Sequence, residues 1–141
     1  MKDFPDHHDA ELALKLYDLR REPLLRESRT HMNQWFPKTF DDIQAVIKPE
    51  HPQNAAFRQV AGYWDMAFNM ARHGVIHADF LAEMSGEGLY FYSKIERFVE
   101  ELRKVSGPRA FRNAEWVAMN TEMGKEMMPL HRARNDKALA G

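Results

Sequence analysis

The sequence contains no cysteine and no long apolar run. A chain without cysteine forms no disulfide, thiolate zinc site or cysteine nucleophile, a composition that suits a reducing compartment. A bilayer-spanning helix needs about 18 consecutive apolar residues, and the first residues lack the apolar core of a signal peptide. We therefore expect a cytoplasmic protein without a transmembrane segment.

Neither sign of charge dominates the sequence. Its 20 lysines and arginines nearly balance 21 aspartates and glutamates, which gives a formal net charge of -1. Such a chain has no overall field that would attract a nucleic acid or an anionic membrane. We predict no nucleic-acid partner on this ground.

The short motifs of several enzyme classes are absent as well. The sequence has no phosphate-binding glycine loop, no dinucleotide fingerprint, no Gly-x-Ser-x-Gly elbow and no His-Glu-x-x-His pair. An active site assembled from distant helices would leave no such motif. We expect no cofactor and favour a protein that is not an enzyme.

Apolar residues recur at helical spacing along most of the chain, and no segment alternates as a strand does. The fold class that follows is all-α, an irregular bundle of five to seven helices. The widest apolar stripes predict two long antiparallel central helices, 54–73 and 88–105. Further helices are predicted over 9–35, as one bent helix or two, over about two turns before Pro49, over 78–84 and from about residue 109 onward.

The size of the chain is that of one domain. Its 141 residues are 44% hydrophobic, enough for one continuous core. We predict a single helical domain over residues 1–141. Because both ends are polar, residues 1–8 and 132–141 are expected to fray.

Aromatic residues gather on the two predicted central helices and could line a pocket between them. A lysine or an arginine at its edge would anchor an acidic ligand. Burial of the rings in the core is the alternative interpretation. The ligand-binding candidates are Trp64, Tyr90, Tyr92, Lys94 and Arg97.

The last predicted helix carries a narrow stripe rich in methionine, a side chain that adapts to irregular binding partners. The stripe could form a homodimer seam or bind a protein partner. Its alternative role is docking onto the core of the same chain. The interface candidates are Trp116, Met119, Met123, Met127 and Leu130.

Histidines and carboxylates, which suit zinc, iron or manganese, cluster around a glycine turn. The turn at Gly74 prevents a simple chelate on one helix. In the alternative interpretation, the carboxylates stabilise the first turns of the next helix and the histidines lie on the surface. We expect no bound metal. The metal candidates are His73, His77, Asp79 and Glu83.

Residues 63–117 carry a resemblance to a known family. The similarity rests on a glycine-capped helix end, an acidic and basic helix, and a final Glu-Trp pair. The corresponding segments are Arg72-His73-Gly74-Val75-Ile76, Lys94 to Lys104, and Phe111 to Trp116. This pattern resembles the uncharacterised bacterial helical family catalogued as domain of unknown function 4760. The resemblance implies a bacterial helical bundle and assigns no catalytic residue.

Three functions are compatible with these features. The first is a non-enzymatic protein-interaction or regulatory module. The second is a small-ligand-binding protein that uses an aromatic pocket between helices. The third is a metal-dependent enzyme around His73 and His77.

Overall fold

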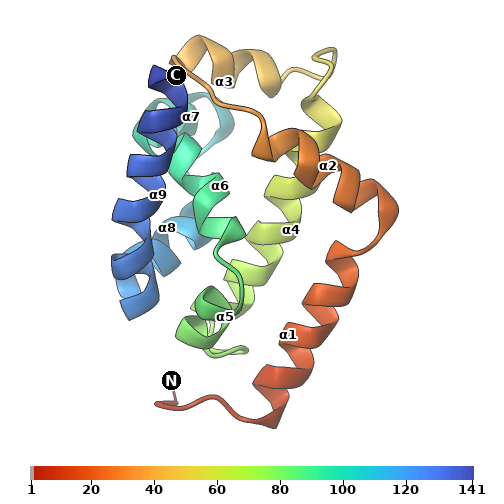
Figure 1. Ribbon diagram of the computed structural model, residues 1–141, viewed down its shortest axis with the longest axis vertical. Helices are drawn as coiled ribbons and strands as arrows, with labels where there is room; N and C mark the ends of the chain where they lie inside the picture. Colours follow the sequence, from red (N-terminus) through yellow and green to blue (C-terminus); the bar gives the residue numbers. More distant parts are fainter. Residues whose placement is uncertain (1) are drawn as a thin grey trace.

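A computed structural model describes residues 2–141, and all regular structure in this range is helical. The all-α prediction is confirmed. The helices are α1 (His7–Arg20), α2 (Pro23–Asn33), α3 (Phe40–Val46), α4 (Asn54–Arg72), α5 (Ala78–Met84), α6 (Glu87–Ile95), the 3₁₀ helix η1 (Glu96–Phe98), α7 (Val99–Ser106), α8 (Arg112–Asn120) and α9 (Glu122–Ala140) (Figure 1). These nine α-helices exceed the predicted five to seven, because several predicted helices are divided.

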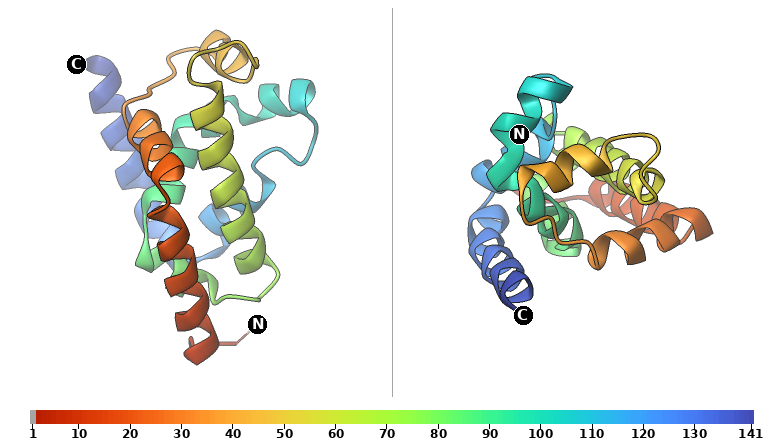
Figure 2. Two further views of the ribbon diagram at one scale, coloured as in Figure 1. Left: turned by 90° about the vertical axis from the view of Figure 1, so that its right-hand side faces the viewer. Right: turned by 90° about the horizontal axis from the view of Figure 1, so that it is seen from above.

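Helix α4 lies in the middle of the molecule, with α1 and α2 on one side and α6, α8 and α9 on the other (Figure 1 and Figure 2). It packs along α2 and α8, whereas α6 packs along α9. The predicted central pair of long antiparallel helices is therefore wrong. The segment 88–105 comprises α6, η1 and α7. Because one 3₁₀ turn rotates the chain only slightly more per residue than an α-helix, the apolar stripe continues through η1 and conceals the break.

The range 9–35 contains two helices, one of the two alternatives left open. Helix α1 ends at Arg20, and Pro23 is the first residue of α2. Proline suits this position because its missing amide would have no partner in the helix. The Glu22 carboxylate accepts hydrogen bonds from the amides of Leu24 and Leu25, so it caps α2.

The single helix predicted from about residue 109 is also divided, at Thr121. The Thr121 hydroxyl donates to the Val117 carbonyl at 2.7 Å and accepts from the Gly124 amide at 2.8 Å. The Asp79 carboxylate accepts from the Met123 amide at 2.8 Å. Side chains thus satisfy the end of α8 and the start of α9, and two helices replace one.

Side-chain contacts are present at both chain ends, where fraying of residues 1–8 and 132–141 stays a prediction. Helix α9 continues to Ala140, and the buried Asn135 side chain fixes it against α6. At the other end, Asp6 and Asp9 form a reciprocal capping box at the start of α1. The buried Asp9 carboxylate also contacts Lys2 and the His77 amide. Met1 lies outside the described residues.

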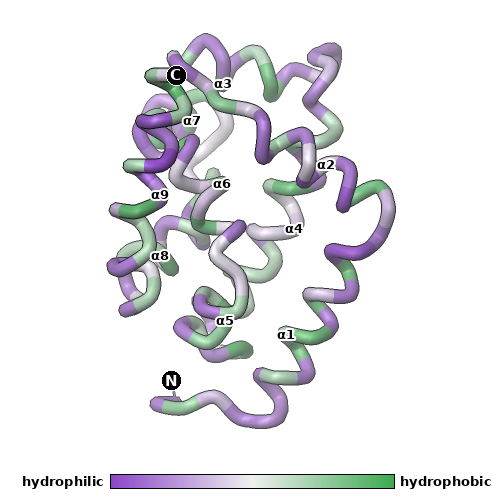
Figure 3. Tube along the Cα trace, viewed as in Figure 1, coloured by the Kyte–Doolittle hydropathy of each residue, from purple (hydrophilic) through white to green (hydrophobic). Residues whose placement is uncertain are grey.

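The apolar core lies between α4, α6 and their neighbours. Phe68, Ile95 and Leu89 are fully buried, and the rings of Trp35 and Phe57 meet edge to face at 5.7 Å. Along α1, apolar and polar residues follow one another in short stretches (Figure 3). Among residues 2–141, no helix combines the length and the apolar composition needed to cross a membrane.

Candidate functional site

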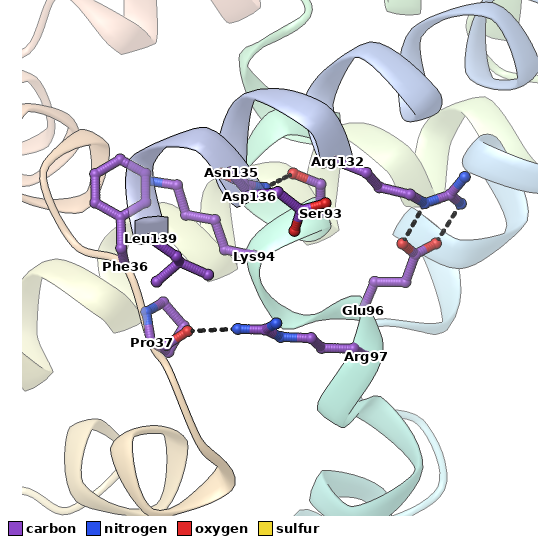
Figure 4. Close-up of a pocket in the computed structure, with 10 residues that line it drawn as sticks. All are labelled: Phe36, Pro37, Ser93, Lys94, Glu96, Arg97, Arg132, Asn135, Asp136 and Leu139. Atoms are coloured by element: carbon purple, nitrogen blue, oxygen red, sulfur yellow. Dashed lines mark hydrogen bonds and ion pairs between the residues drawn. The ribbon is translucent and has the colours of Figure 1, made fainter. Parts of the chain in front are cut away.

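A cavity of about 180 Å³ lies between α6 and α9, which we call the α6–α9 cavity. Three segments build it: the connector after α2, the end of α6 with η1, and the last three turns of α9 (Figure 4). Apolar, acidic and basic side chains all reach it. Its lining residues are Phe36, Pro37, Ser93, Lys94, Glu96, Arg97, Arg132, Asn135, Asp136 and Leu139.

Lys94 is a buried cation in the wall of this cavity. Its ammonium donates to the Met32 carbonyl at 2.7 Å and lies 4.3 Å and 4.8 Å from the ring centres of Phe36 and Tyr90. Carbonyls in the last turn of a helix favour a cation, so Lys94 fastens the end of α2. Within residues 2–141, Lys94 forms no ion pair with a carboxylate. Burial, together with the nearby charge of Arg134, lowers the pKa of Lys94 to about 8.

The pKa of Lys94 predicts a pH dependence of stability. Between pH 8 and 10.5 the unfolded chain binds more protons at this lysine than the folded chain does, so the free energy of unfolding rises with pH. We expect chemical denaturation of the wild type to show this rise from about pH 8 to about pH 10, and Lys94→Met to lack it. The buried phenols of Tyr63 and Tyr92, whose pKa values are raised, reverse the trend above pH 10.

An equal rise in Lys94→Met would show that another group causes it. The same titration of Lys38→Met, which removes an exposed lysine next to the cavity wall, is the matched control. It should retain the wild-type rise.

Asn135 contributes a polar group that lacks a partner. Its amide nitrogen donates to the Ser93 hydroxyl at 2.5 Å, and this hydroxyl donates to the Tyr90 carbonyl at 2.6 Å. Although the residue is buried, its Oδ1 has no hydrogen-bond partner in the described part of the chain. A buried acceptor without a donor costs about 1–3 kcal/mol, so this atom suits a ligand that carries an N–H or O–H group.

Two side chains of opposite charge at the cavity retain free hydrogen-bonding capacity. Arg97 uses one nitrogen to bind the Pro37 carbonyl at 3.0 Å, and Asp136 forms no ion pair or side-chain hydrogen bond within residues 2–141. Arg132 and Glu96, by contrast, pair with each other through two bonds of 2.7 Å (Figure 4). The cavity therefore offers an unneutralised cation and an unneutralised anion.

A second cavity, of about 260 Å³, lies under the loop between α7 and α8, and we call it the aromatic cavity. Trp64 and Tyr92 line it, whereas Tyr90 contacts Lys94 and lies near the first cavity. The five ligand-binding candidates are thus divided between two places. Successive helical residues turn by about 100°, so Tyr92 and Lys94 lie on opposite faces of α6.

The interface candidates occupy two helices instead of one stripe. Trp116 and Met119 belong to α8, and the other three belong to α9. Met119 is 66% exposed and Leu130 is 68% exposed, while Trp116, Met123 and Met127 are partly buried. A role of these residues in protein contacts remains a prediction.

The metal candidates are spread out and partly occupied. The His77 ring accepts from the Phe80 amide at 3.1 Å and caps α5, while Asp79 caps α9. His73 and Glu83 do not join them: across residues 2–141, no group of three or more histidine or acidic side chains is placed to hold a metal ion. Asp79 lies in the first turn of α5, where the alternative interpretation placed it, but Glu83 lies near the end of that helix. The cap formed by His77 belongs to neither interpretation.

Sequence reasoning missed Ser93, Asn135 and Asp136. The last two lie in the polar end that was expected to fray, and Ser93 is the small polar residue in the run from Leu89 to Ile95, all of which is buried. In the sequence, the only features that point to them are a serine within an apolar run and an asparagine at helical spacing from Met128. Neither indicates that the two side chains meet.

Comparison with known proteins identifies a family. No curated protein and no solved structure matches the chain. A family model matches residues 5–121, which include the whole aromatic cavity and end before α9. The resemblance found over 63–117 is confirmed and extends further. The matching model is described as Domain of unknown function (DUF4760), and the chain belongs to that family.

Proposed function

We propose that this chain is a small-ligand-binding protein whose α6–α9 cavity takes an α-amino acid. One observation carries the proposal: the residues that line one small cavity include a guanidinium with free N–H groups, an unpaired carboxylate and a buried amide oxygen without a partner. Few other small ligands combine an anion, a cation and an apolar group in the way an α-amino acid does.

Each part of an amino acid has a partner in this cavity. The ligand carboxylate binds Arg97, whose planar fork matches a carboxylate in two places. The ligand ammonium binds Asp136 and donates to the free Oδ1 of Asn135. The side chain packs on Phe36 and Leu139, two lining residues that come from the connector after α2 and from the end of α9 (Figure 4).

The cavity volume limits the size of the ligand. An apolar cavity of about 150 Å³ holds benzene, so about 180 Å³ accepts a small aliphatic side chain together with its charged groups. Leucine and valine fit this volume better than the aromatic amino acids. We therefore take L-leucine as the probe.

Calorimetric titration with three probes tests the proposal. L-leucine is compared with 3-methylbutylamine, which lacks the carboxylate, and with 4-methylpentanoate, which lacks the ammonium. We expect L-leucine to bind and each truncated probe to bind at least about tenfold more weakly, because each loses charge-assisted hydrogen bonds. Equal binding of a truncated probe, or no binding of L-leucine or L-valine at about 10 mM, would overturn the proposal.

The carboxylate of Asp136 gives the most specific variant. Asp136→Asn keeps the shape and removes the charge from an exposed side chain without a structural partner, so the fold should be unaffected. We expect the Kd for L-leucine to rise about tenfold and the Kd for 4-methylpentanoate to stay constant. Glu126→Gln, the same change at an exposed position of α9, is the control and should bind as the wild type does.

A protein-interaction role is supported by a separate observation. Met119 and Leu130 are two-thirds exposed on neighbouring helices, a high exposure for large apolar side chains. The proposal that the surface around them forms a homodimer or binds a protein partner is tested by light scattering over a range of concentrations. A strictly monomeric chain whose Met119→Gln variant behaves identically would count against the homodimer.

A further inference from the structure

Two adjoining hollows lie beyond the other face of α6 and share no lining residue with the α6–α9 cavity. They are the aromatic cavity and a pocket of about 650 Å³, which we call the arginine pocket. The two share Asp65 and Arg109. The arginine pocket is lined by Asp65, Asn69, Arg72, His73, Pro108, Arg109, Arg112 and Asn113.

We propose that these two adjoining hollows bind a purine nucleoside monophosphate, with the base in the aromatic cavity and the phosphate in the arginine pocket. The order of the three chemical surfaces carries this proposal. Aromatic rings lie at one end, the Asp65 carboxylate and the Arg109 guanidinium lie at the boundary, and two further guanidinium groups lie at the other end. A nucleotide has the matching order of base, ribose and phosphate.

The aromatic end suits a heterocyclic base. Trp64, Phe68, Phe91, Tyr92 and Phe111 all line it, and rings of this kind stack on bases regardless of sequence. The Trp64 indole N–H is buried and has no hydrogen-bond partner among the described residues. A ring nitrogen of a purine supplies the acceptor that this donor lacks. The cavity is larger than the roughly 150 Å³ that holds benzene, as a bicyclic base requires.

The other end suits a phosphate. Three arginines line it, and the guanidinium fork binds phosphate oxygens in pairs. Arg109 forms no ion pair or side-chain hydrogen bond within residues 2–141, so its donors are free. Arg112 binds the Pro108 carbonyl at 2.7 Å and lies 3.6 Å from Glu115, so it is only partly neutralised. This cluster stands out in a chain whose net charge is -1.

Asp65 borders both hollows, at the position where the ribose would lie between base and phosphate. Its carboxylate accepts from the Asn113 amide at 3.0 Å, and Arg72 donates to the oxygen of the same amide at 3.4 Å. This chain fixes Asp65 and leaves its second oxygen free for a hydroxyl. An acidic residue that hydrogen-bonds ribose hydroxyls is a recurrent feature of nucleotide sites.

Adenosine monophosphate is the probe for this site, and calorimetry of the full chain is the measurement. We expect it to bind, and we expect adenosine and inorganic phosphate each to bind at least about tenfold more weakly, since each occupies only one end. No binding of adenosine or guanosine monophosphate at about 10 mM overturns the proposal, as does equal binding of adenosine and its monophosphate.

Two variants separate the ends of the site. Arg109→Gln should weaken adenosine monophosphate about tenfold and adenosine much less, because its guanidinium pairs with the phosphate. Arg58→Gln, at an exposed arginine of α4 outside both hollows, should change neither. Gly62→Leu places a side chain at the mouth of the aromatic cavity, where a β-carbon meets no atom within 4 Å. It should fold normally and bind neither compound.

Retained binding of adenosine monophosphate in both Arg109→Gln and Gly62→Leu would place any nucleotide elsewhere and contradict the proposal. Asp136→Asn serves as a cross-check. This variant alters only the α6–α9 cavity and should bind adenosine monophosphate as the wild type does. The amino-acid proposal and the nucleotide proposal therefore fail or succeed separately.

Discussion

Replacing Gly124 by alanine is expected to lower the free energy of unfolding by about 3 kcal/mol. Gly124 lies in the first turn of α9, where the chain folds back against the end of α8. A β-carbon here would lie 2.6 Å from the Ala118 carbonyl oxygen and also overlap the Val117 carbonyl oxygen. Because both are backbone atoms of an adjacent helix, neither can move without displacing α8 from α9.

Gly62→Ala is the matched control, and its expected change in the free energy of unfolding has the opposite sign. Gly62 lies within α4, and a β-carbon there meets nothing within 4 Å. Alanine is the better helix former by about 1 kcal/mol, so this variant should gain stability of up to that amount. Urea denaturation of both variants measures the two changes. A Gly124→Ala protein as stable as the wild type would show that α8 and α9 do not meet as described.

Replacing Asp9 by alanine is expected to cost about 3 kcal/mol of unfolding free energy. The Asp9 carboxylate is fully buried and accepts from the amides of Asp6 and His77, at 2.8 Å and 2.7 Å, while Lys2 lies 2.7 Å away. Removing it leaves two amides without partners and separates the start of α1 from the start of α5. Asp18→Ala, on the exposed side of the same helix, should change stability by less than about 0.5 kcal/mol.

The pH dependence of this contact follows from its pKa. Burial by itself raises the pKa of Asp9, but the hydrogen bonds from Lys2, Asp6 and His77 outweigh it and hold the pKa below its usual 3.8. The contribution of Asp9 is therefore complete above about pH 4 and is lost as the pH falls through the lowered value. We expect the stability difference between wild type and Asp9→Ala to shrink in acid. A difference that stays constant down to about pH 2 would contradict the assignment.

The local parts of the fold were readable in the sequence. A short helix is predicted before Pro49, and at the start of α3 the Thr39 amide donates to the Asp42 carboxylate, three residues away. Gly74 predicts the end of α4, and its φ of 74° is one that glycine adopts without strain. These signals succeed because the interacting groups lie within a few residues of each other.

The candidate sites depend on contacts that no local pattern encodes. Lys94 binds a carbonyl 62 residues away, and Asn135 meets a serine 42 residues away. The break at Thr121 is stabilised by Asp79, 44 residues earlier than the amide that it caps. Periodicity describes which face of a helix is apolar, but it does not state which helix covers that face. Lys94 and Arg97 line the α6–α9 cavity, whereas the predicted pocket lay between the segments 54–73 and 88–105. Their role in ligand binding stays a prediction.

The most direct test of the amino-acid site is a titration of isotopically labelled protein with L-leucine, followed by backbone and side-chain amide shifts in nuclear magnetic resonance. The free Oδ1 of Asn135 accepts a hydrogen bond from the ligand in this account. We predict the largest changes at the Asn135 side-chain amide and at the backbone amides of Ser93 and Asp136, with little change around Trp64. Unchanged spectra, or changes confined to residues outside the α6–α9 cavity, would contradict the proposed function.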